Sequence, residues 1–172
     1  MSITETKKSE NIIDKVSTFK TSITNVINNN DSHILTITSQ PGFGCHNMLW
    51  SMCKENDWKA FDPRTIYDEN AIYDEMFKTA IESAEQDPDK KYILILDDIN
   101  RYNNDMANAI LNMLLTLENN DNIPSNLYVI IKVCYMEGYI ESMAETNLED
   151  IVIKALEKHG IYDYDKCFEQ TP

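Results

Sequence analysis

Apolar residues recur at every third or fourth position in several stretches of the chain, which is the spacing of one face of an α-helix. In the first stretch this face consists of Ile12, Val16, Phe19, Ile23 and Val26. The spacing predicts helices over 10–27, through 48–53, and over 69–86, 105–117 and 148–158. Gly160 follows the last of them, in the position where a glycine commonly ends a helix.

Segments of apolar and β-branched residues lie between the helical stretches and predict strands over 33–38, 58–61, 92–96 and 127–133. The run at 92–96 is uninterrupted, as expected for a strand that a parallel sheet buries on both faces. Strands that alternate with helices imply a parallel sheet with right-handed crossovers. We therefore expect an α/β fold in a single domain over 1–172, with an N-terminal helix at 1–30, a core at 31–143, and a helix and acidic tail at 144–172.

The end of the chain combines acidic and aromatic residues. Residues 163–169 are acidic, and Tyr162, Tyr164 and Phe168 lie in or beside them. Such a segment is either a docked or frayed terminus or a contact segment for another protein, because exposed aromatic side chains are favoured anchors at interfaces.

The chain carries a formal net charge of -14 and 42% hydrophobic residues, which is the composition of a globular protein with an acidic surface. This charge argues against direct binding to nucleic acid, whose phosphates need a basic surface. It is compatible with a solvated surface, with attraction to a basic partner, or with mimicry of the charge of DNA. Neither an apolar run that could span a membrane nor a signal-peptide core is found, so we expect a cytoplasmic protein without a membrane partner.

Ligands of parallel α/β sheets bind at the carboxyl ends of the strands, and the turn after the strand at 33–38 has an unusual composition. The chain has 4 glycines, and two of them, Gly42 and Gly44, lie in this turn. The segment Ser39-Gln-Pro-Gly-Phe-Gly-Cys-His46 resembles the phosphate-binding Walker A loop of AAA+ ATPases, which are P-loop NTPases.

The resemblance to Walker A is partial. The matching positions are Pro41, Gly42 and Gly44, and Phe43 falls at a variable position. Ser39 stands where the family has its first glycine, Cys45 where it has lysine, and His46 where it has Ser or Thr.

Two later segments resemble the same family. Tyr92-Ile-Leu-Ile-Leu-Asp-Asp-Ile-Asn-Arg101 resembles the Walker B strand of the MoxR and McrB branch, with Asp97 at the metal-associated position and Asp98 in place of the catalytic Glu. Ile123-Pro-Ser-Asn-Leu-Tyr-Val-Ile-Ile-Lys-Val-Cys134 is similar to the strand leading to sensor 1, whose Asn falls on Cys134. The resemblance implies a three-layer P-loop NTPase fold. We find no counterpart of the arginine finger or of the C-terminal helical lid.

By resemblance, a nucleotide site would consist of Pro41, Gly42, Phe43, Gly44, Cys45, His46 and Asp97. The replacements alter its chemistry, because a Walker A lysine contacts the phosphates and the Ser/Thr hydroxyl binds Mg²⁺. Cys45 cannot supply the lysine charge, and Mg²⁺ prefers oxygen ligands to the nitrogen atoms of His46. We therefore expect a catalytically inactive AAA+-like protein, without a cofactor, that binds a protein partner such as a homologous AAA+ ring subunit.

Two other functions are compatible with the sequence. A divergent ATPase or GTPase would bind its nucleotide with Mg²⁺ at Asp97 and use Asp98 as the catalytic carboxylate. An acidic DNA mimic would inhibit a DNA-binding or restriction protein. Cys45 and Cys134 are interpreted as small fillers, with a thiol-based metal site that includes His46 and Asp97, or a redox-linked pair, as the alternatives.

Overall fold

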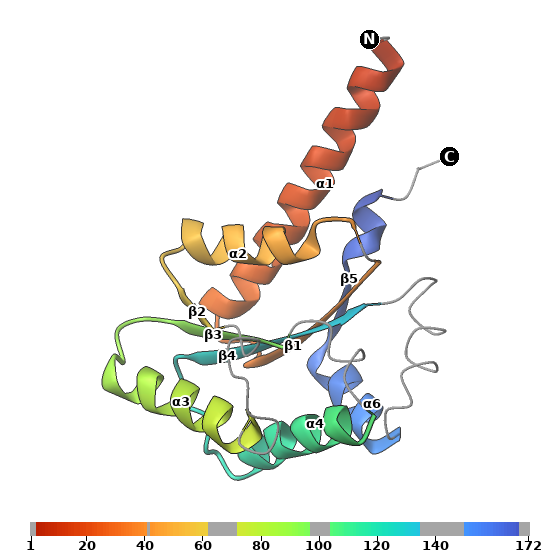
Figure 1. Ribbon diagram of the computed structural model, residues 1–172. Coiled ribbons are helices and arrows are strands. Elements are labelled where there is room, and N and C mark those ends of the chain that lie inside the picture. Colours follow the sequence, from red (N-terminus) through yellow and green to blue (C-terminus); the bar gives the residue numbers. More distant parts are fainter. Residues whose placement is uncertain (1–2, 41, 62–71, 97–103, 135–149, 169–172) are drawn as a thin grey trace.

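Five parallel strands form the centre of the molecule, and helices cover both faces of their sheet (Figure 1). The computed structural model describes residues 3–40, 42–61, 72–96, 104–134 and 150–168. The helices are α1 (Ile3–Asn28), α2 (Cys45–Glu55), α3 (Ile72–Gln86), α4 (Asn104–Asn119) and α6 (Asp150–His159). The strands are β1 (Ile34–Ser39), β2 (Lys59–Phe61), β3 (Tyr92–Leu96), β4 (Leu127–Cys134) and β5 (Ile161–Asp163), and a 3₁₀ helix, η3 (Tyr164–Phe168), follows β5.

The strands lie side by side in the order β2-β3-β4-β1-β5. β1 pairs with β4 on one side and with β5 on the other, so that Ile37 has Lys132 and Tyr162 as its neighbours. Parallel neighbours cannot be joined by a hairpin, and helices return the chain between them. The predicted parallel α/β sheet between two helical layers is therefore confirmed.

Each face of the sheet carries its own hydrophobic core. On the face covered by α1 and α2, residues such as Ile27 and Leu49 pack on Ile130. On the face covered by α3, α4 and α6, residues such as Phe77 and Leu111 pack on the other side of the sheet. Every residue of β1 and β3 is buried, as expected for strands that are covered on both faces.

Most elements lie within a few residues of their predicted positions. β3 has the predicted bounds, and all four predicted strands are present. α1 begins at Ile3 rather than at residue 10, because the helix continues beyond its apolar face. The predicted starts of α3 and α6 lie outside the described residues. β5 was not predicted, since its residues belong to a segment interpreted as a tail, and this segment is docked rather than frayed over 161–168.

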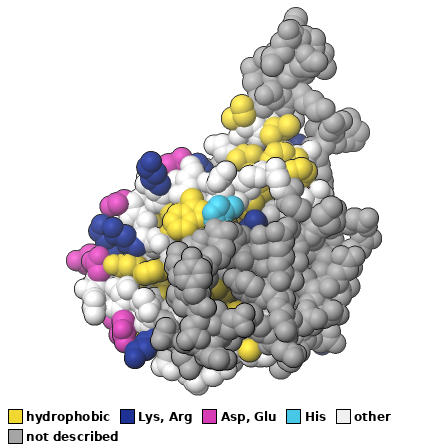
Figure 2. Space-filling view, in the orientation of Figure 1, with side chains coloured by type: hydrophobic (Ala, Val, Ile, Leu, Met, Phe, Trp, Pro, Cys, Tyr) yellow, Lys and Arg dark blue, Asp and Glu magenta, His cyan; other side chains and the backbone are white. Residues whose placement is uncertain are grey.

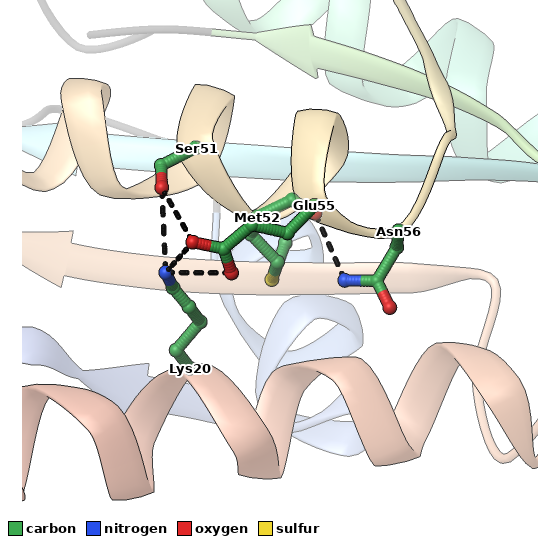
Figure 3. A network of polar contacts seen from close by, with 5 residues as sticks. All are labelled: Lys20, Ser51, Met52, Glu55 and Asn56. Atoms are coloured by element: carbon green, nitrogen blue, oxygen red, sulfur yellow. Dashed lines mark hydrogen bonds and ion pairs between the residues drawn. The ribbon is translucent and has the colours of Figure 1, made fainter.

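A polar network joins α1 to α2 (Figure 3). Lys20 Nζ lies 2.8 and 2.9 Å from the two carboxylate oxygens of Glu55 and 3.3 Å from Ser51 Oγ. The hydrogen bond from Lys20 is the main cause that lowers the pKa of the Glu55 carboxyl group. Because Glu55 is exposed, this network orients the two helices more than it stabilises them. None of the helices in the described residues, including α1, is both long and apolar enough to cross a membrane.

Asn126, just before β4, holds the turn between α3 and β3. Its side-chain Nδ2 lies 2.9 Å from the carbonyl oxygen of Ala84, 3.2 Å from that of Asp87 and 2.8 Å from that of Lys90. These carbonyls belong to the end of α3 and to the turn that follows it. The asparagine of the third sequence segment therefore has a role in folding.

We expect Asn126→Ala to lower the free energy of unfolding by about 1–3 kcal/mol, because half-buried carbonyls lose their donor. Urea denaturation measures the effect. Asn120→Ala is the control, since Asn120 is exposed, and it should change stability by less than ~0.5 kcal/mol. Equal effects of the two substitutions would contradict this role of Asn126.

Candidate functional site

The loop between β1 and α2 crosses the carboxyl end of a central strand. Pro41 lies outside the described residues. Gly42 and Gly44 have φ values of 84° and 79°, in the left-handed region that glycine adopts without strain. A Cβ atom on either glycine would meet no atom within 4 Å. The predicted glycine turn is therefore present, and its left-handed backbone conformation favours glycine at both positions.

Cys45 and His46 begin α2 directly after this turn, with Gly44 as the N-cap residue. Cys45 is 2% exposed and packs in the core between α2 and the sheet, together with Met48. The ring of His46 lies beside that of Trp50, one turn further along the helix, with 6.0 Å between the ring centroids. The position that resembles the Walker A lysine is thus a buried thiol without a fixed positive charge.

β5 and η3 form a C-terminal strap, residues 161–168, that lies against this loop. Both carboxylate oxygens of Asp165 accept the backbone N–H of Gln40, at 3.0 and 3.1 Å. Asp163 Oδ1 accepts the backbone N–H of Asp165 at 3.1 Å and the hydroxyl of Thr38 at 3.5 Å. Asp165 is only 8% exposed, so a buried carboxylate of the chain itself is bonded to the backbone of the loop.

Aromatic contacts tie the strap to the loop and to α1. The ring of Phe168 packs on that of Phe43, with 4.7 Å between the centroids. Tyr164 makes edge-on contacts with Phe168 and with Phe19 of α1, each at 5.3 Å. Burial is the first cause that raises the pKa of the Tyr164 phenol to about 12, and the nearby Cys45 contributes next. The strap therefore bridges the loop and α1.

A cleft of about 670 Å³ lies between α1 and the strap. Its lining includes Thr18 and Phe19 from α1 and Tyr162 and Lys166 from the strap. Loop residues 42–46 do not line it. This cleft and the loop predicted from the sequence are thus separate features, with the strap between them.

Lys132, which is 8% exposed within β4, was not predicted as a site residue. It pairs with Ile37 and lies two positions after Ile130 in β4, so its side chain belongs to the same face as Ile130, the face covered by α1 and α2. The available signal was a lysine inside an otherwise apolar strand pattern. This buried ammonium group lies on the same face of the sheet as Cys45.

Asp97 and Asp98, the predicted metal-associated and catalytic carboxylates, lie outside the described residues. For Cys134 the structure gives the backbone position, opposite Ser39 at the carboxyl ends of β4 and β1. The small-filler, metal-site and redox-pair interpretations of Cys45 and Cys134 stay predictions. Within the described residues, no group of three or more His, Cys, Asp or Glu side chains could hold a metal ion.

Comparison with known proteins identifies the fold. Neither a protein-family profile nor a curated protein sequence matches the chain. The structure of Drosophila ORC bound to poly(dA/dT) DNA and Cdc6 is similar with a TM-score of 0.54 and 8% identity, over 92% of this chain and 31% of that one. The chain thus has the fold of an AAA+ P-loop NTPase core.

Two further structures are similar at lower scores. Caenorhabditis elegans PCH-2 has a TM-score of 0.47 and 12% identity, over 91% of this chain and 40% of that one. Cdc6p from Pyrobaculum aerophilum has a TM-score of 0.49 and 14% identity, over 76% of this chain and 38% of that one. The chain therefore spans about two fifths of the length of these proteins.

The environment of Tyr164 predicts an alkaline loss of stability. The pKa of its phenol is raised from 10.0 to about 12 in the folded protein. The neutral phenol therefore contributes fully to the free energy of unfolding below pH 10, and this contribution is lost as the pH rises to about 12. The loss amounts to about 2–3 kcal/mol. Unfolding measured by urea between pH 9 and pH 12 should show a shallower decline for Tyr164→Phe than for the unchanged protein. Parallel declines would refute this assignment, because other groups titrate alike in both proteins.

Proposed function

We propose that this chain is a non-hydrolysing AAA+-type scaffold that acts by binding a protein partner. The observation that carries the proposal is the buried Cys45, which begins α2 directly after the glycine turn. A phosphate-binding loop of this type needs a lysine there to compensate the charge of the β- and γ-phosphates. A thiol that packs among Met48 and Leu49 supplies no such charge.

The charges around the loop support the same proposal. The Asp165 carboxylate already accepts the N–H of Gln40, and the whole chain has a net charge of -14. A triphosphate placed at this loop would be repelled by Asp165 and by the overall field of the protein. The nearby buried cation, Lys132, lies within β4 beside Ile37 rather than in the loop.

Exposed hydrophobic groups support action through a protein contact. Figure 2 shows hydrophobic side chains gathered over the described part of α1, the helix that extends beyond the sheet in Figure 1. Ile13 of α1 is 64% exposed, and Phe43 of the loop is 36% exposed. Large exposed apolar side chains are favoured at protein interfaces. A homologous AAA+ ring subunit is the partner that the shared fold suggests.

The proposal predicts that ATP with Mg²⁺ at millimolar concentration neither raises the melting temperature of the protein nor is hydrolysed. Cys45→Lys should bind ATP about tenfold more tightly or better, because a charge-assisted hydrogen bond contributes ~1.5–3 kcal/mol. Asn29→Lys is the matched control, since it adds the same charge at an exposed site away from the loop. Binding and turnover by the unchanged protein would favour the divergent ATPase instead, and loss of that binding in Asp97→Ala would strengthen this alternative.

The partner is tested by mixing the protein with subunits of McrB-like AAA+ rings and recording native mass spectra. A complex is expected, and Ile13→Asp should weaken it at least ~tenfold, because a charge replaces an apolar anchor. Asn25→Asp adds the same charge at another exposed position of α1 and should leave the complex intact. A protein that stays monomeric with every such subunit would contradict this choice of partner.

A further inference from the structure

We propose that the C-terminal strap is an intrachain latch, in which the Asp165 carboxylate holds the loop between β1 and α2 closed in place of a bound anion. The inference rests on the proposed function, because a loop that holds no nucleotide needs another source of order. The strap would regulate that site, because whatever binds at the loop must first displace the strap.

Hydrogen bonding joins the carboxylate of the strap to the loop. Asp165 directs both oxygens at a single backbone N–H, that of Gln40, at 3.0 and 3.1 Å. Gln40 is the first residue after β1. Asp165 is only 8% exposed, and water screens a hydrogen bond to a buried carboxylate less than one at the surface. An anion supplied by the chain thus fixes the point where the loop leaves the sheet.

The sheet and the turn after β5 position this carboxylate. β5 pairs with β1 through Thr36, Ile37 and Thr38, and the pairing ends at Asp163. Asp163 accepts the hydroxyl of Thr38 and the backbone N–H of Asp165. Strand pairing and this turn together place Asp165 at the carboxyl end of β1. Pairing within the sheet therefore positions the backbone that carries the carboxylate.

Aromatic rings make the contact at the far end of the strap. Phe168 packs on Phe43, which lies between the two left-handed glycines. Tyr164 contacts Phe168 on one side and Phe19 of α1 on the other. A change in the glycine turn would move Phe43 away from Phe168. Loop and strap consequently open and close as one unit, held by a carboxylate at one end and by aromatic rings at the other.

The test measures backbone hydrogen exchange by NMR on the protein alone. In Asp165→Asn the amide of Gln40 loses its carboxylate, and we expect it and the amides of 42–46 to exchange at least about tenfold faster. Phe168→Ala, which removes the aromatic end, should accelerate the same amides. The amides of Ile93 and Ile95 in β3 should keep their protection in both variants, which shows that the sheet remains folded.

Asp31→Asn is the matched control. It removes the same charge from an exposed residue that precedes β1 at its other end, and exchange in the loop should stay unchanged. Unchanged protection of Gln40 and of 42–46 in both Asp165→Asn and Phe168→Ala would overturn the latch. Because neither nucleotide nor partner is present, ATP turnover or the lack of a ring partner would refute the proposed function without affecting this result.

Discussion

The position of β1 inside the sheet constrains the rest of the molecule. All six of its residues are buried, and it pairs with β4 on one side and β5 on the other. The backbone groups of a strand enclosed on both faces and both edges are paired along its length, so the chain can enter and leave it only at its ends. The chain must therefore leave β1 at its carboxyl end through a tight turn, and the strap that continues from β5 meets this turn. The loop, α2 and the strap converge because they share this one neighbour.

The same enclosure explains how polar groups are arranged around β1. Thr38 is fully buried, and its hydroxyl is bonded to Asp163 of the strap. The hydroxyls of Thr36 and Ser39 are buried without a hydrogen-bond partner within the described part of the chain. Burying a hydroxyl without a hydrogen-bond partner lowers the stability of the fold. Each hydrogen bond that the strap makes to β1 or to Gln40 therefore contributes more to stability than a bond at the surface would. The strap thus contributes both to the stability of the fold and to the conformation of the loop.

The helices and strands that the sequence predicted are those whose apolar residues follow a regular local spacing. The periodicity of Met76 and Ala80 located α3, and the apolar run of β3 gave its exact bounds. The glycines at 42 and 44 predicted the turn, because a left-handed φ is a property of a single residue. α2 begins at Cys45, three residues before the apolar spacing that predicted this helix.

Features that depend on contacts distant in sequence could not be predicted in this way. β5 has three residues, too few for alternation to be recognised, and its partner β1 lies more than a hundred residues earlier. The bond between Asp165 and Gln40 spans 125 positions. An acidic residue near the end of a chain is ordinarily solvated, so its burial depends on the surface it meets. Lys132 was overlooked because a strand pattern classes it with its apolar neighbours.

The glycine turn connects the end of β1 both to the strap and to α2. Gly42 and Gly44 have left-handed φ values, which glycine adopts without strain. This conformation sets Phe43, between them, against Phe168 and lets Gly44 cap α2. A side chain at either glycine would strain the backbone, so the contact with the strap and the start of the helix depend on the same two residues.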